Sequence, residues 1–99
     1  MAYKLIWSPV SREDLRDIVR FVASDSPRRA EEFAYRLIHE TDLLQQFPEM
    51  GRMVPERRNP AIRELLFRPY RIVYRVNHDK KTVEIARVWH AARGTPRLR

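Results

Sequence analysis

The sequence predicts an α+β fold in which a helical hairpin packs on one face of a mainly antiparallel, four-stranded sheet. Two neighbouring segments have the periodicity of amphipathic helices, and three segments with strand-like alternation follow them. A short alternating segment precedes the helices, so the order is strand, helix, helix, strand, strand, strand. A chain of 99 residues is long enough for one domain. We expect that domain to span residues 1–93, with 94–99 forming a short basic tail that packs against nothing.

The first strand and the first helix are predicted from residues 3–25. Large apolar residues alternate with other residues over 3–7, which is typical of a short strand, and Ser8-Pro9 should end it. Apolar residues then recur at helical spacing between Leu15 and Ala23. Ser11 is the expected N-cap of this helix, because serine at a helix start accepts a hydrogen bond from a free backbone N–H.

The second helix is predicted to start at Ser26-Pro27, where serine is the N-cap and proline occupies the first helical position. Its apolar stripe runs from Ala30 to Leu44. Pro48 disfavours the helical conformation at the residue before it, so the helix should end near Phe47. The connection between the two helices is very short, which makes them antiparallel neighbours.

Three strands are expected at about 62–67, 70–77 and 82–90, after a loop over 48–60 that contains three prolines. In the middle strand, Arg71 and Arg75 fall on the face opposite to Ile72 and Tyr74, because side chains alternate with period two. One face therefore covers the core, and no further element remains to cover the other. We expect function on this open arginine-bearing face.

Composition points to an anionic partner and to an intracellular location. Lys and Arg total 20 against 13 Asp and Glu, which gives a net charge of +7. Arginine presents a planar fork that matches phosphate or carboxylate, so a nucleic acid or an acidic protein is indicated. Cysteine is absent, and the N-terminus has no signal-peptide pattern. No apolar run has the length needed to cross a bilayer. We therefore expect a cytoplasmic protein that does not bind membranes.

Several kinds of chemistry are excluded by the residues present. All four serines sit at expected strand ends or helix starts, and no Gly-x-Ser-x-Gly motif exists. Two glycines are too few for a P-loop or a dinucleotide fingerprint. The three histidines lie far apart without metal-ligand spacing. We expect neither a cofactor nor a metal site.

Three residues near the arginine-bearing face have two interpretations each. His90 is either a half-buried strand-end residue bonded to backbone, the commoner case, or a proton donor or acceptor beside Arg71. Arg71 is either a solvated strand residue or part of an anion site shared with neighbouring arginines. Trp89 is either a core residue, which we favour, or a platform on which a base stacks.

Several motifs together resemble one known family, the RelE/ParE superfamily of toxins from bacterial type II toxin–antitoxin modules. The resemblance covers nearly the whole chain, and the element order predicted above is also that of the family. The motifs are Asp14-Leu15-x-x-Ile18, Pro48-x-x-Gly51-Arg52-x-Val54-Pro55-Glu56, Arg63-Glu64, Tyr70-Arg71-Ile72-Val73-Tyr74 and Val88-x-His90-x-x-Arg93.

The resemblance implies a growth-arresting toxin of a plasmid-stabilisation system, neutralised by a cognate antitoxin whose acidic, partly disordered segment wraps it. RelE-like members cut mRNA on the ribosome without a metal, whereas ParE-like members block DNA gyrase. Carried over from the nuclease branch, Arg71 would contact the scissile phosphate, His90 would be the general acid and Glu56 the general base. The arginines expected to hold nucleic acid or antitoxin are Arg52, Arg57, Arg58, Arg63, Arg75 and Arg93.

Two departures from RelE keep the target open. Arginines replace the lysine-rich loop of that enzyme, and its tyrosine-bearing C-terminal segment is missing. We therefore expect a toxin that acts by ribosome-dependent mRNA cleavage, with inhibition of DNA gyrase as the alternative. A non-toxic nucleic-acid-binding domain is a further alternative.

Overall fold

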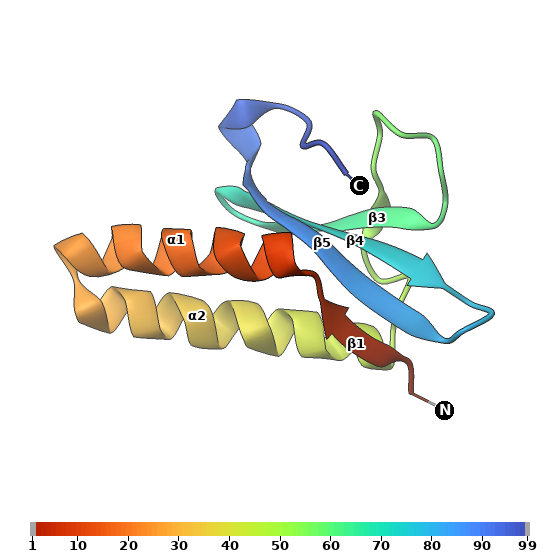
Figure 1. Ribbon diagram of the computed structural model, residues 1–99, viewed down its shortest axis with the longest axis horizontal. Coiled ribbons are helices and arrows are strands. Elements are labelled where there is room, and N and C mark those ends of the chain that lie inside the picture. Colours follow the sequence, from red (N-terminus) through yellow and green to blue (C-terminus); the bar gives the residue numbers. More distant parts are fainter. Residues whose placement is uncertain (1, 99) are drawn as a thin grey trace.

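A computed structural model describes residues 2–98 and confirms the α+β fold, with a helical hairpin on one face of the sheet (Figure 1). The sheet order is β1-β5-β4-β3-β2. The strands are β1 (Lys4–Trp7), β2 (Arg52–Met53), β3 (Ile62–Phe67), β4 (Tyr70–Asn77) and β5 (Thr82–His90). The last three have the bounds that the sequence predicts.

The sheet has five strands, so the prediction of four was wrong. The additional strand, β2, has only two residues and pairs with Arg63 and Glu64 of β3. Two residues are too few to show alternation, and nearby Gly51 and Pro55 are typical of a loop, so nothing local indicates this strand. The sheet is mixed, because β1 runs parallel to β5 whereas the remaining pairs are antiparallel.

The first helix, α1 (Pro9–Asp25), starts earlier than predicted. Its N-cap is Ser8, whose Oγ accepts a hydrogen bond from the Ser11 backbone N–H at 3.1 Å. Pro9 occupies the first turn, where its missing N–H leaves no hydrogen bond unmade. Ser11 was therefore the wrong choice of cap, and it lies fully buried inside the first turn.

The second helix, α2 (Pro27–Asp42), starts as predicted, with the Ser26 side chain accepting a hydrogen bond from the Arg29 N–H at 3.2 Å. It ends before Phe47, and a 3₁₀ turn (Leu43–Gln45) leads into the loop. Among residues 2–98, no helix is long and apolar enough to cross a membrane.

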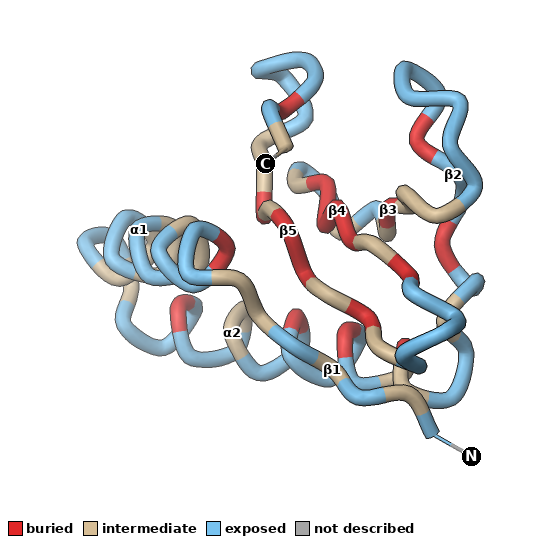
Figure 2. Tube along the Cα trace, turned by 45° about the vertical axis from the view of Figure 1, so that its right-hand side comes forward, coloured by how far each residue is buried: buried red, intermediate tan, exposed pale blue. Residues whose placement is uncertain are grey.

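The core lies between the helical hairpin and the sheet (Figure 2). It combines α2 and the 3₁₀ turn with the inner faces of β4 and β5. The fully buried apolar members at its centre are Leu37, Leu44, Ile72, Tyr74, Val83 and Ile85. Tyr74 therefore belongs to the core, as the alternation in β4 predicts.

Gly51 fixes the loop before β2 against the sheet. Its backbone N–H donates to Tyr74 Oη at 2.9 Å. A Cβ at this position would lie 2.5 Å from the Glu64 carbonyl oxygen and 2.7 Å from Tyr74 Oη. Only glycine permits so close an approach, which holds the loop beside β3 and β4.

The C-terminal segment turns back over the sheet face opposite the helices and runs beside the loop before β3 (Figure 1). It begins with a 3₁₀ turn (Ala91–Arg93), and Pro96 is buried. Arg57 Nη2 donates to the Pro96 carbonyl oxygen at 3.2 Å. The expectation that this segment packs against nothing and leaves the face open was therefore wrong. Backbone carbonyls that satisfy guanidinium groups explain this packing, and sequence pattern alone does not reveal such contacts.

Candidate functional site

The candidate site is the sheet face opposite the helices, which we call the arginine face and define by Glu64, Arg71, Arg75, Arg87 and Trp89. Strand register brings these residues together. Arg71 of β4 lies opposite Trp89 of β5, and Arg75 is in register with Glu84. Val73 of β4 pairs with Arg87 on one side and Glu64 on the other.

Arg71 lies at the centre of the arginine face and is bound by two carboxylates. Its Nε donates to Glu64 Oε1 at 2.5 Å, and its Nη2 donates to Glu56 Oε1 at 3.0 Å. Nη1 donates to the Gly94 carbonyl at 2.8 Å and to Glu56 Oε2 at 3.3 Å. Arg71 is only 6% exposed. Its guanidinium group is thus almost fully occupied by the protein itself.

The pairing changes the acid–base properties of both partners. Hydrogen bonds from Arg71 and then from Thr95 lower the pKa of Glu56 from 4.5 to about 2. Burial would lower the pKa of Arg71, but its hydrogen bonds to Glu56 and Glu64 raise it overall. Glu56 is therefore held as a carboxylate and Arg71 as a cation.

Glu64 is a buried carboxylate that pairs with both Arg52 and Arg71. Its side chain is fully buried, and Oε2 accepts a hydrogen bond from Arg52 Nε at 2.7 Å. Arg52 Nη2 also lies 2.7 Å from this oxygen, in an ion pair. Its other oxygen accepts from Arg71. A buried charge is tolerated only when it is paired and hydrogen-bonded, and two arginines meet that requirement here.

Sequence reasoning missed a second ion pair, between Arg87 of β5 and Asp14 of α1. Arg87 Nε and Nη2 donate to the Asp14 carboxylate at 2.8 and 3.0 Å, and the Val88 N–H donates to the same carboxylate at 3.0 Å. These contacts raise the pKa of Arg87, mainly through the hydrogen bond to Asp14. Alternation in β5 could have placed Arg87 on this face, but its partner lies far away in the sequence.

Trp89 lies on the arginine face, so the preferred placement in the core was wrong. The guanidinium carbons of Arg87 and Arg93 lie over its ring, 4.7 and 4.2 Å from the centroid. Such cation–π contacts hold both arginines in place. The ring already has cationic partners in the position where a stacked base would lie.

His90 ends β5 and is aligned with Tyr70 rather than with Arg71. Its Nδ1 accepts a hydrogen bond from the Ala92 N–H at 3.1 Å, and its ring meets that of Tyr70 edge-to-face at 5.4 Å. Alternation directs His90 toward the helix side of the sheet, away from the side that Arg71 faces. This backbone hydrogen bond agrees with the commoner interpretation of His90, that of a strand-end residue with a structural role.

The three proposed catalytic residues nevertheless border one cavity. This cavity, of about 560 Å³, lies where β4 begins and β5 ends. Glu56, Arg71 and His90 line it together with Arg52 and Arg68. The structure thus brings the three residues to one cavity, with Glu56 and Arg71 bonded to each other.

Three of the predicted binding arginines, Arg52, Arg63 and Arg75, have partners in the sheet region. Arg52 binds Glu64, and Arg75 Nη1 lies 3.3 Å from Glu84. Arg63 is in register with Tyr74 and therefore faces the helix side, where its Nη1 donates to the Gly51 carbonyl at 2.9 Å. Arg63 is not part of the arginine face.

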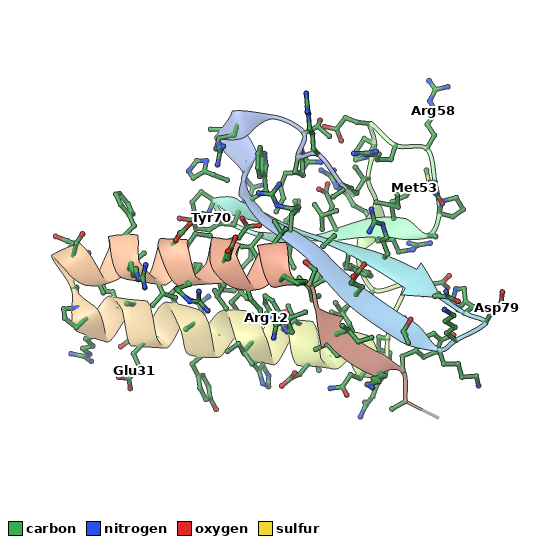
Figure 3. All side chains as sticks on the ribbon, viewed as in Figure 1. Arg12, Glu31, Met53, Arg58, Tyr70 and Asp79 are labelled. Carbon is green, nitrogen blue, oxygen red and sulfur yellow. The ribbon has the colours of Figure 1, made fainter. Side chains whose placement is uncertain are left out.

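The other three predicted binding arginines lie outside the strands, in the loop before β3 and in the 3₁₀ turn after β5. Arg57 holds the C-terminal segment through Pro96, and Arg93 lies over Trp89. Arg58 is exposed and extends away from the molecule at the tip of its loop (Figure 3). Among residues 2–98, no three His, Asp or Glu side chains are grouped so as to hold a metal ion.

The sequence and the fold of this chain are both similar to those of toxins from type II toxin–antitoxin systems. The model of the ParE toxin of the type II toxin–antitoxin system parDE matches residues 5–94. Toxin RelE2 of Caulobacter vibrioides is 34% identical over 91 residues, which cover 91% of this chain and 97% of that toxin.

Three solved structures share the fold. The chromosomal ParDE toxin–antitoxin system of P. aeruginosa superposes with a TM-score of 0.71 at 26% identity, covering 90% of this chain and 96% of that chain. The toxin–antitoxin complex RelBE2 of Mycobacterium tuberculosis gives 0.65 at 22% identity, covering 91% and 99%. A free mutant form of E. coli RelE gives 0.63 at 21% identity, covering 95% and 88%. At these lower identities the last two show the fold alone.

The fold, the basic sheet face and these matches define a small toxin of a bacterial type II toxin–antitoxin module. A cognate antitoxin is therefore its expected partner. Within that class, the chain belongs to the ParE toxin family of the RelE/ParE superfamily.

Proposed function

We propose that this toxin arrests growth by binding its target rather than by cutting RNA, and that the target is DNA gyrase, as for ParE-like toxins. The observation that carries the proposal is the pairing of Arg71, which is only 6% exposed, with Glu56 and Glu64. A scissile phosphate would have to displace both carboxylates to reach this guanidinium.

The state of Glu56 also supports the proposal. A general base works best when its pKa lies near the operating pH. Glu56 has a pKa of about 2, because Arg71 and Thr95 donate hydrogen bonds to it. A carboxylate whose pKa lies this far below neutral pH is a weak base and has little tendency to take a proton from a ribose hydroxyl.

His90 lacks the arrangement expected of a general acid acting with Arg71. Its Nδ1 is bonded to the Ala92 N–H, and its ring packs against Tyr70. A proton donor must approach the leaving oxygen while the cation contacts the same phosphate. Strand register instead directs His90 and Arg71 to opposite faces of the sheet.

Metal-independent cleavage of mRNA is the second candidate. It is favoured by the cavity that Glu56, Arg71 and His90 line together. In that mechanism the Arg71–Glu56 pair would open on the ribosome, so that Arg71 holds the phosphate and Glu56 takes up the proton.

Two measurements separate these functions. Purified toxin should inhibit supercoiling by DNA gyrase, and transcripts mapped in arrested cells should show no toxin-dependent ends. The variant His90→Ala should still arrest growth, because the proposal gives His90 no chemical role. Cut transcripts together with a non-toxic, folded His90→Ala protein would establish the ribonuclease instead.

A further inference from the structure

Three hydrogen-bonded side chains meet beside the start of β1, outside the arginine face. Tyr3 Oη lies 2.6 Å from Nδ1 of His78, which belongs to the turn between β4 and β5. His78 Nε2 lies 3.2 Å from Oε2 of Glu49, in the loop that follows α2. Asp79, the residue after His78, marks this turn in Figure 3. The three side chains come from segments far apart in the sequence, and the proposed function gives them no role.

The direction of the hydrogen bonds makes His78 a proton acceptor toward Tyr3. A carboxylate only accepts hydrogen bonds, so the neutral ring carries its proton on Nε2 and donates it to Glu49. The lone pair of Nδ1 then accepts the hydrogen bond from the Tyr3 hydroxyl. A hydroxyl, a base and a group that orients the base are arranged in this order where enzymes activate a hydroxyl nucleophile.

A cavity of about 450 Å³ borders the base, and its lining includes His78, Asn59 and Asn77. Asn59 Oδ1 accepts a hydrogen bond from the Ala61 N–H at 2.9 Å, and Asn77 Oδ1 accepts one from the Lys80 N–H at 3.0 Å. The backbone thus occupies both amide oxygens and leaves the Nδ2 groups as donors. Amide donors of this kind stabilise a carbonyl oxygen on which negative charge develops. The cavity therefore has the polar groups to hold a carbonyl compound beside His78.

We propose that Tyr3 Oη is a modification site that accepts an acyl group from an activated acyl donor, with His78 as the general base. The phenol oxygen forms a bond to the carbonyl carbon of the donor, and the bond between that carbon and its leaving group breaks. The phenol proton passes to His78 Nδ1 and from the imidazole to the leaving group, which departs protonated. The product is an acyl ester of Tyr3. Glu49 is a positioning residue, because it acts through His78.

Tyr35 provides a comparison within the same chain. It lies on α2 and is 75% exposed, whereas Tyr3 is half-buried. Accessibility alone would make Tyr35 the more reactive phenol. A general base in hydrogen-bond contact with Tyr3 reverses this order.

The test treats the purified, full-length toxin with N-acetylimidazole at neutral pH and follows acetylation of each tyrosine with time. Cleavage after glutamate places Tyr3 and Tyr35 on different peptides, so mass spectrometry gives both rates. Hydroxylamine removes acetyl groups from tyrosine oxygen but not from lysine, which distinguishes an ester at Tyr3 from an amide at Lys4. Tyr3 should react about tenfold faster than Tyr35, a smaller effect than in an enclosed active site.

The variant His78→Gln removes the base and should lower the Tyr3 rate about tenfold. A purely structural role of His78 predicts the opposite, because loss of the contact would expose the phenol. The matched control is His39→Gln, the same change at an exposed histidine of α2, and it should leave the Tyr3 rate within about twofold of wild type.

Two variants test the positioning role of Glu49. Glu49→Leu removes the acceptor for His78 Nε2 and should lower the Tyr3 rate by about threefold or more. The amide oxygen of Glu49→Gln can accept the same hydrogen bond, so this variant should retain most of the rate.

Two results would overturn the proposal. The first is faster acetylation of Tyr35 than of Tyr3 in the wild-type toxin, a comparison that needs no variant to fold. The second is a Tyr3 rate in folded His78→Gln that equals or exceeds the wild-type rate, which would give His78 a structural role only. The inference is independent of the toxin's target, so evidence for RNA cleavage would leave it intact.

Discussion

The arginine face and the exposed row of Arg12, Arg16 and Arg20 on α1 both display guanidinium groups, but the two sets differ in what they bind. On the arginine face, Arg71 and Arg87 each form at least two hydrogen bonds to carboxylates of the toxin. On α1, Arg12, Arg16 and Arg20 have no acidic partner among the residues described. The number of positive charges therefore does not show which guanidinium groups are free to bind a partner, whereas the contacts inside the protein do.

The two regions should therefore respond differently to substitution. A paired and buried arginine contributes to folding, because removing one partner leaves a charge in a poorly solvated site. An unpaired and exposed arginine contributes little to folding and remains free for another protein.

The largest effect is expected for Glu64→Ala. This change leaves Arg71 buried without its strongest partner and should lower the free energy of unfolding by about 3 kcal/mol or more. Urea denaturation followed by circular dichroism measures it. Glu13→Ala on the exposed side of α1 is the control and should change stability by less than about 0.5 kcal/mol. Equal losses of stability at both positions would contradict the expected difference between paired, buried charges and exposed ones.

A smaller loss is expected for Gly51→Ala, which tests how the loop is held against the sheet beside the arginine face. The new Cβ would collide with the Glu64 carbonyl and with Tyr74 Oη, so stability should fall by about 1–3 kcal/mol. An undiminished melting temperature for Gly51→Ala would mean that the loop is not held this closely.

The contact between Arg71 and Glu56 should make the stability of the protein depend on pH in the acid range. Glu56 has a folded-state pKa of about 2 against an ordinary 4.5, so its contribution is present above about pH 4.5 and is lost as the pH falls toward 2. Its side chain is 44% exposed, which reduces the size of this contribution. As the pH is lowered over this range, the melting temperature of Glu56→Gln should therefore fall less steeply than that of wild type. Parallel curves would contradict the contact.

The smallest effect on stability is expected for the triple variant Arg12→Gln/Arg16→Gln/Arg20→Gln. Removing three like charges from one row should leave the free energy of unfolding within about 0.5 kcal/mol of wild type, or raise it slightly. Denaturant titration at low salt gives the value. A loss of more than about 1 kcal/mol would show that these arginines have structural partners after all.

The sequence predicted the elements well where the determinants are local. Alternation in 70–77 and 82–90, with a polar turn between them, was enough to define β4 and β5. The Ser26-Pro27 pair likewise located the start of α2. Each of these signals lies within a few residues of the element that it specifies.

The pairing of the arginines could not be predicted in the same way, because it depends on long-range contacts. Asp14 and Arg87 are 73 residues apart in the chain and meet only after α1 packs on β5. The C-terminal segment and β2 are likewise held by contacts to distant residues. The groove beside α1 is formed by residues from different elements, including Trp7 of β1 and Ile38 of α2, so the helical pattern of α1 alone does not reveal it.

We propose that Arg71 serves the fold and not a chemical step, and the double variant Glu64→Leu/Arg71→Met tests this role most directly. Replacing a buried ion pair by apolar side chains of similar size often preserves stability, so this protein should fold. The measurement is growth arrest after expression without antitoxin. We predict arrest equal to that of wild type. A folded double variant that no longer arrests growth would contradict this structural role and place Arg71 among the residues that act on the target.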